Sequence, residues 1–218
     1  MAEKKLSIDA YLLVFFAAWS VYASTVYPVL LDSLEYVVVE FADSAIKLLI
    51  WTLPAVLLIR RYQDDMYIGL SEMLTTKPGW FISFSALLLS VLVPLIEALV
   101  LHGEIRILPD FTPETLISVV VFIGITEEVV FRGFLLNALL KRMKLWPAVM
   151  INAALFALIH CPGYINRELD FTTIFIDSIT VLIPLSMFFA FSFIKTKNII
   201  VPIILHMIWN LLMTLFVV

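Results

Sequence analysis

The stretch TEEVVFR (residues 126–132) sets three ionisable side chains inside an apolar run that extends from about Leu116 to Leu140. If this run crosses a membrane, the three charges lie at bilayer depth. A charged side chain near the bilayer centre costs about 3 kcal/mol on insertion scales, so it persists where it is paired or faces a polar cavity. The stretch is therefore the first candidate for a functional site.

The composition of the whole chain is that of a membrane protein. Of its 218 residues, 62% are hydrophobic and only 15% are charged, and the mean hydropathy is +1.05. Apolar runs of about 20 residues recur without the alternation that strands would show, which favours membrane-spanning helices. We expect an all-α fold, a polytopic helical bundle that forms a single transmembrane domain over residues 1–218. The lone Cys161 excludes an internal disulfide.

Seven spans can be placed, each near the length that a hydrocarbon core of roughly 30 Å requires. The predicted spans are residues 10–31, 44–59, 80–101, 113–140, 146–160, 171–194 and 199–218. Three of them lie in residues 1–112 and four in residues 113–218. The short acidic stretch at residues 34–41 is predicted to be an interfacial segment. Pro162 follows the fifth span and is expected to end that helix early.

Lysine and arginine residues outside the spans are distributed unevenly. If the seven spans alternate in direction, only Arg106 and Arg167 fall on the side opposite the N-terminus. Ten fall on the same side as the N-terminus: Lys4, Lys5, Arg60, Arg61, Lys77, Lys141, Arg142, Lys144, Lys195 and Lys197. The positive-inside rule then predicts a cytoplasmic N-terminus and an external C-terminus. We expect the protein to be integral to the cell (plasma) membrane.

The charges of the fourth span differ in their local partners. Glu128 and Arg132 are four residues apart and share a helix face, which permits a charge-assisted hydrogen bond. Glu127 is rotated by about 100° from Glu128 and has no local partner. Arg132 thus accounts for one carboxylate, whereas Glu127 needs partners on other helices. A packing network between helices is the non-functional alternative.

Two later spans offer such partners. Phe156 and His160 are four residues apart in the fifth span, and His206 and Asn210 are four apart in the otherwise apolar seventh. A lipid-facing His or Asn would be costly, so we expect these faces to turn inward. From the rise of about 1.5 Å per residue, their depths match that of Glu127. We expect one cluster, reached from the cytoplasmic half.

A carboxylate, two imidazoles and an amide inside a membrane suit hydrolysis. Glu127 can take a proton from water, a histidine can position that water or protonate the leaving amine, and His206 with Asn210 can stabilise an oxyanion. Glu127, His160 and His206 can instead hold a divalent metal such as zinc with an open position for water. The sequence has no HExxH motif, so both a metal and none stay open. Cys161 is a weaker nucleophile candidate, because it points about 100° away from its neighbour His160.

The three motifs resemble those of a known family. EExxxR (residues 127–132), FxxxH (156–160) and HxxxN (206–210), in this order on three helices, are similar to those of the CPBP family. That family comprises the type II CAAX prenyl endopeptidases and the bacteriocin-processing or self-immunity (Abi) proteins. The resemblance covers residues 113–218, about half of the chain, and implies that this region is the catalytic core.

The resemblance implies a glutamate-dependent intramembrane endopeptidase. Carried over by position, Glu127 is the glutamate that activates water and His160 is its partner. The remaining residues are the oxyanion pair His206 and Asn210, and the supporting residues Glu128, Arg132 and Phe156. The family has been called a metalloprotease group, and a glutamate and histidine mechanism without metal is also argued. Its name therefore leaves the cofactor open.

We predict an intramembrane endopeptidase that hydrolyses a peptide bond of a membrane-associated peptide or of a lipidated protein C-terminus. The lipid bilayer is the other expected partner, and we expect no nucleic acid. The alternative is a non-catalytic membrane scaffold or immunity protein, or a proton-coupled transporter that uses the same buried Glu and His cluster.

Overall fold

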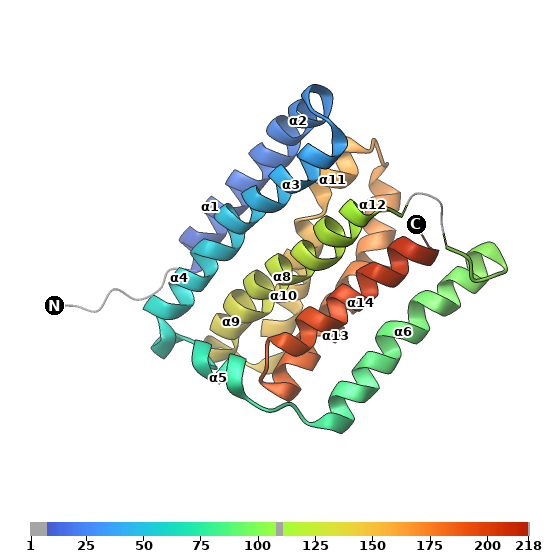
Figure 1. Ribbon diagram of the computed structural model, residues 1–218. Coiled ribbons are helices and arrows are strands. Elements are labelled where there is room, and N and C mark those ends of the chain that lie inside the picture. The colour runs from blue at the N-terminus through green and yellow to red at the C-terminus, as the bar shows by residue number, and fades with distance from the viewer. Residues whose placement is uncertain (1–7, 108–110, 218) are drawn as a thin grey trace.

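The computed structural model describes residues 8–107 and 111–217 of the chain. Within these residues all regular structure is helical, and the long helices lie side by side along a common direction (Figure 1). Lys4, Lys5 and Val218, which entered the charge count and the last predicted span, lie outside the described residues. The predicted all-α bundle is confirmed.

Helical segments join end to end into seven long helices. The first two are α1 (Ile8–Val21) with α2 (Tyr27–Ser33), and α3 (Tyr36–Lys47) with α4 (Leu53–Arg61), joined by π-helical turns at Tyr22–Val26 and Leu48–Thr52. The third is α6 (Trp80–His102). The fourth runs from α7 (Pro113–Thr115) through Leu116–Phe122, α8 (Ile123–Glu128) and Val129–Leu136 to α9 (Asn137–Arg142). The last three are α10 (Leu145–Leu158) with α11 (Cys161–Asn166), α12 (Phe171–Asp177) with Ser178–Leu182 and α13 (Ile183–Thr196), and α14 (Ile200–Phe216).

Most of these helices have the length and composition of membrane spans. Five are long and apolar enough to cross a membrane: Ile8–Ser33, Tyr36–Arg61, Trp80–His102, Leu145–Asn166 and Phe171–Thr196. Of the other two, α14 is apolar but has 17 residues, and the helix over residues 113–142 carries the charged EExxxR motif. The long helices follow the order of the seven predicted spans, and the fold is a polytopic membrane bundle.

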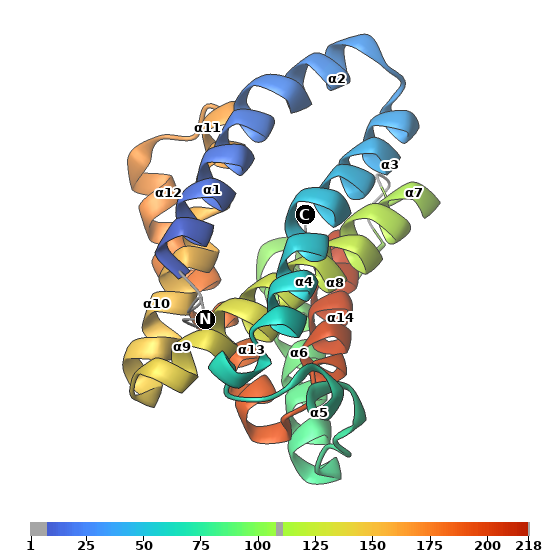
Figure 2. The same cartoon turned by 90° about the vertical axis from the view of Figure 1, so that its left-hand side faces the viewer.

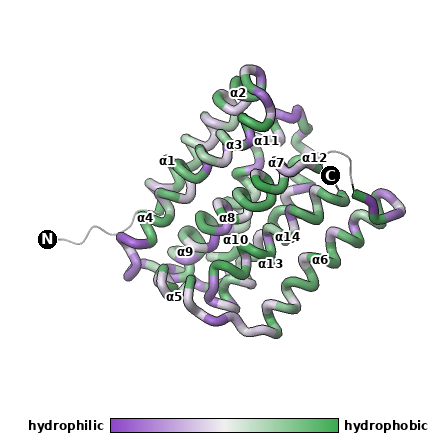
Figure 3. Tube along the Cα trace, in the orientation of Figure 1, coloured by the Kyte–Doolittle hydropathy of each residue, from purple (hydrophilic) through white to green (hydrophobic). Residues whose placement is uncertain are grey.

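The surface of the bundle suits a lipid environment. Figure 3 shows hydrophobic residues along the helices and hydrophilic residues mainly at helix ends and connecting segments. Large apolar side chains of α6 point outward, with Trp80 exposed by 78% and Val100 by 76%. An exposed apolar surface of this extent would be a liability in water and is expected of a surface that contacts lipid.

Two predicted boundaries are wrong. Residues 34–41 do not form a separate interfacial segment, because α3 begins at Tyr36 and its acidic residues turn inward, where Asp43 is bonded to Tyr22 and Lys47. The fifth long helix does not end at His160, because α11 continues it to Asn166 after a turn at residues 159–160. Pro162 lies in the first turn of α11, where a missing N–H leaves no hydrogen bond unmade.

One end of the bundle is closed by the segment between α4 and α6, which contains α5 (Leu70–Thr75). The Asn137 side chain accepts from the backbone N–H of Ile68 and donates to its carbonyl, both at 2.7 Å. The N–H of Ile199 donates to the Met73 carbonyl at 2.9 Å. Figure 2 shows α5 at this lower end, whereas α2, α7 and α11 lie toward the other end. These bonds hold residues 62–79 against α9 and the start of α14.

A close approach of α8 to α14 brings two parts of the candidate site together. A Cβ atom built on Gly124 would lie 2.8 Å from Cγ and 3.4 Å from the backbone N of Met207. Only glycine fits at this separation, as is common where membrane helices pack backbone to backbone. Met207 directly follows His206, so Gly124 sets the distance between that imidazole and the glutamates of the fourth helix.

We expect Gly124→Ala to destabilise the protein by about 1–3 kcal/mol, the usual cost of overpacking a well-packed interior. Gly133→Ala on the same helix is the matched control, since its Cβ would meet its nearest neighbour at an ordinary 3.7 Å. The measurement is the free energy of unfolding in mild detergent. Equal stability of the two variants would show that α8 and α14 are not in tight contact.

Candidate active site

The four residues predicted to act on substrate line one cavity. This cavity has a volume of about 470 Å³, and Glu127, His160, His206 and Asn210 are all in its wall. They come from α8, from the turn between α10 and α11, and from α14. Glu127 is 7% exposed, so its carboxylate is nearly buried but reaches the cavity.

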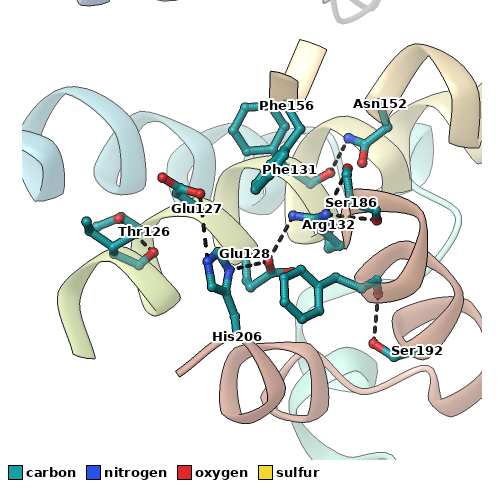
Figure 4. A network of polar contacts seen from close by, with 12 residues as sticks. Thr126, Glu127, Glu128, Phe131, Arg132, Asn152, Phe156, Ser186, Ser192 and His206 are labelled. Carbon is teal, nitrogen blue, oxygen red and sulfur yellow. Dashed lines mark hydrogen bonds and ion pairs between the residues drawn. The ribbon is translucent and has the colours of Figure 1, made fainter. Parts of the chain in front are cut away.

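Behind the cavity wall lies the buried ion pair predicted from the EExxxR spacing. Arg132 Nη1 donates to Glu128 Oε1 at 2.8 Å, and both side chains are fully buried. Arg132 Nη2 also donates to the backbone carbonyl and the hydroxyl of Ser186, each at 2.9 Å (Figure 4). The predicted pairing of Glu128 with Arg132 is confirmed, and Ser186 ties it to α13.

His206 connects the two glutamates. Its Nδ1 lies 2.8 Å from Glu128 Oε1, and its Nε2 lies 4.0 Å from Glu127 Oε2 (Figure 4). Because Glu128 is held as a carboxylate by Arg132, Nδ1 donates the hydrogen and Nε2 is directed to the cavity. At 4.0 Å the contact with Glu127 is too long for a direct hydrogen bond. The ring stacks on Phe189 with centroids 4.7 Å apart, which fixes its plane.

His160 is positioned by the end of α10. Its Nδ1 donates to the backbone carbonyl of Phe156 at 2.9 Å, so Nε2 is the ring nitrogen available to a ligand. The helix breaks here, and the indole N–H of Trp19 donates to the freed carbonyl of Ile159 at 2.8 Å. Phe156 itself contacts both imidazoles, with ring centroids 5.1 Å from His160 and 6.2 Å from His206.

Asn210 lies one turn beyond His206 on α14. Its Nδ2 donates to the backbone carbonyl of Val119 at 3.0 Å. This bond ties α14 to the start of the fourth long helix. It uses one of the two N–H groups of the amide, so the second N–H can donate to another acceptor. His206 and Asn210 therefore share the cavity face that their spacing predicted.

The three residues considered as zinc ligands do not converge on one point. In the described part of the chain, no group of three His, Cys, Asp or Glu side chains is arranged to hold a metal ion. Zinc needs ligand atoms about 2.0–2.2 Å from the ion, in a tetrahedral set. Glu127, His160 and His206 as arranged here do not fit it.

Sequence reasoning missed residues that hold the ion pair in place. Asn152 donates to the backbone carbonyl of Phe131 at 2.8 Å, and the guanidinium of Arg132 lies 4.7 Å from the Phe156 ring and 5.4 Å from the Phe189 ring. Asn152, an amide inside an apolar span, carried the same signal as Asn210. Ser186 accepts from Arg132 through both its backbone carbonyl and its hydroxyl, and its partner lies 54 positions away in the sequence, so no local spacing signals this role.

Two other polar residues inside spans lie outside this cluster. The carboxylate of Asp177 accepts a hydrogen bond from the hydroxyl of Tyr164, which joins α12 to α11. Glu97 lines a separate, mostly apolar cavity of about 300 Å³ between α6 and α13. Asp177 thus bonds one helix to another, and Glu97 does not belong to the candidate site.

The cavity lies toward the end of the bundle that has few basic residues. Its lining residues on the fourth long helix are Val119, Ile123 and Glu127, all between Glu127 and the Pro113 end, and on α14 they run from His206 toward the C-terminus. The prediction that the cluster is reached from the end rich in Lys and Arg is wrong. Helix packing decides which side of a buried residue is hollow, and depth along one helix does not.

Fold and site together define a class: a polytopic membrane protein in which a glutamate, two histidines and an asparagine line an intramembrane cavity. Residues 110–212 match the family described as type II CAAX prenyl endopeptidase Rce1-like. This match covers just under half of the chain and supports a CPBP intramembrane protease, as the three motifs indicated. No curated protein and no solved structure matches the chain. The matched family is one of prenyl endopeptidases, so the match supports protease (hydrolase) activity of the CAAX type in general.

Proposed function

We propose that this protein is an intramembrane endopeptidase in which Glu127 activates water against a peptide bond. The observation that carries the proposal is the separation of the two glutamates. Glu127 lines the cavity together with His160, His206 and Asn210, whereas Glu128 and Arg132 are wholly buried behind it. The arrangement gives one carboxylate access to substrate and uses the other for support.

The chemistry follows from the atoms that reach the cavity. Glu127 takes a proton from water while the water oxygen bonds to the carbonyl carbon of the peptide, and the carbonyl oxygen becomes an oxyanion. Nε2 of a protonated His206 and the free N–H of Asn210 donate to that oxyanion. The C–N bond then breaks, and the leaving amine takes the proton from Glu127. His160 Nε2 positions the water, because Nδ1 is already bonded.

Glu128 is a positioning residue in this scheme. It accepts from both Arg132 and His206 at 2.8 Å, so it holds the His206 ring with Nε2 toward Glu127. Membership of a protease family favours this use of the cluster over a scaffold, an immunity protein without activity or a proton-coupled transporter. The proposed substrate is a membrane-associated peptide or a lipidated protein C-terminus, cut in the cell membrane.

The proposal is tested by comparing peptide termini in membranes of cells that make the wild-type protein and cells that make Glu127→Gln. We expect paired new N- and C-termini, within or near a membrane anchor, in wild-type membranes alone. Such pairs would also identify the substrate. Identical termini in both membranes would refute the proposal.

Removing metal should not remove activity. The candidate ligands do not form a zinc site in this arrangement, so we expect hydrolysis by the purified protein to be unchanged after dialysis against a strong chelator. The measurement is the rate of cleavage before and after dialysis, with the metal content determined on the same sample. Loss of activity that returns with added Zn²⁺, and with no other divalent ion, would contradict this expectation.

A further inference from the structure

We infer that the active-site cavity opens on the extracytoplasmic face of the membrane, so that its substrates are membrane-anchored peptides presented from that face. This inference rests on the proposed function for the nature of the substrate, but not for the direction of the opening. Two features of the molecule show which end of the bundle is open, and a third assigns that end to a side of the membrane.

The first feature is the position of the cavity along each helix. Six of the long helices contribute lining residues. On each of them, these residues lie between about the middle of the helix and the same end of the bundle. Examples, one from each of these helices, are Trp19, Lys47, Val119, Tyr164, Leu182 and Asn210. Gly163 and Arg167 are exposed, and they lie in and directly after α11. The cavity therefore reaches the surface at the end where α11 lies.

The second feature is that the opposite end is closed. Below Glu127 the fourth helix continues through Phe131, Phe134 and Leu135, which are all fully buried. The segment over residues 62–79 then crosses this end, held by Asn137 and by the backbone of Ile199. A peptide would have to displace both layers to reach Glu127 from this side.

The third feature is the distribution of charge. The closed end carries the basic residues at the ends of α4, α9 and α13, among them Arg60, Lys141 and Lys195. The structure describes residues 8–107 and 111–217. Among these residues, the Lys and Arg residues that lie outside helices at the open end are Arg106 and Arg167 alone. Since basic connecting segments stay in the cytoplasm, the closed end is cytoplasmic and the open end faces outward.

Polar residues of the first two long helices near the opening are paired with one another. Lys47 bonds to Asp43 at 2.7 Å and lies over the Trp19 ring at 5.5 Å, and Asp43 also accepts from the Tyr22 hydroxyl at 2.9 Å. Lys47 and Asp43 therefore neutralise each other, and the charged side chains that remain in the wall are Arg167 and Glu127. The opening suits the juxtamembrane part of an exported peptide that keeps an apolar anchor in the outer leaflet.

The face can be tested without activity, by labelling single cysteines in a Cys161→Ser background. Gly163→Cys and Gly79→Cys form a matched pair, since both glycines are exposed and a Cβ at either meets nothing within 4 Å. In intact bacterial cells, a membrane-impermeant maleimide should label Gly163→Cys, and label Gly79→Cys only after permeabilisation. Labelling of Gly79→Cys in intact cells, or failure of Gly163→Cys to react before permeabilisation, would overturn the inference.

A second measurement uses a mixture of synthetic membrane-anchored peptides. Added to membrane vesicles, it should be cleaved by right-side-out vesicles and not by inverted ones. Cleavage by inverted vesicles alone would overturn the proposed face and leave the peptidase intact, with a cytoplasmic lipidated C-terminus as the substrate class. If the purified protein cleaves none of the peptides in detergent, the proposed function fails, while the cysteine labelling still decides the face.

Discussion

Glu127→Gln lowers the rate of peptide hydrolysis by about 10³-fold or more, within the range of about 10²–10⁴ that a general base contributes. Glutamine keeps the volume of the side chain and one carbonyl oxygen, but it cannot take a proton from water. Among the residues that the structure describes, the Glu127 carboxylate has no side-chain hydrogen bond and contacts His206 Nε2 at 4.0 Å, so its replacement leaves the packing intact. The expected change is in the turnover number, with the free energy of unfolding unchanged.

The control for this experiment is Glu97→Gln, the same substitution at another glutamate within a span. Glu97 lines the apolar cavity beside α6, and none of the proposed catalytic or supporting residues is in the wall of that cavity. Its variant should cleave peptides at the wild-type rate. Comparable rates for wild type, Glu97→Gln and Glu127→Gln would exclude Glu127 as the base.

Arg132→Met destabilises the protein by about 3–5 kcal/mol, the usual cost of removing one partner from a buried ion pair. The side chain of Arg132 is fully buried, and its loss leaves Glu128 as a buried carboxylate that only His206 can partly compensate. The hydrogen bonds to Ser186 and the contacts with Phe156 and Phe189 are lost as well. The measurement is unfolding in mild detergent.

The double variant Glu128→Leu with Arg132→Met separates the charge from the packing. Because it removes both charges, it should be more stable than Arg132→Met alone. It should hydrolyse peptides more slowly than the wild type does, since His206 then lacks the carboxylate that orients Nδ1. If the double variant is less stable than Arg132→Met, the two side chains contribute to stability mainly through their packing and not through their charges.

The features that the sequence predicted depend on neighbours along one helix. Continuous apolar runs indicated the seven long helices, and the spacing of four residues indicated the bond between Glu128 and Arg132. The spacing of His206 and Asn210 likewise indicated their shared face. Such relations follow from helix geometry alone, so no knowledge of the packing was needed.

The features that the sequence did not predict depend on contacts between helices. His206 bonds to Glu128 rather than directly to Glu127, because the close packing at Gly124 sets where α14 lies. Ser186 and Trp19 bond to partners 54 and 140 positions away in the sequence, so no spacing along one helix could reveal these bonds. The continuation past Pro162 and the direction of the cavity also arise from packing, in the second case from the segment held by Asn137.

The most direct test of the central claim is to follow the atoms of the reaction. Purified wild-type protein and Glu127→Gln are each incubated with synthetic membrane-anchored peptides in water enriched in ¹⁸O, and the products are weighed by mass spectrometry. We predict, for the wild type alone, paired fragments that carry one heavy oxygen in the new C-terminal carboxylate. Absence of fragments with the wild type, or the same labelled fragments with Glu127→Gln, would contradict the account.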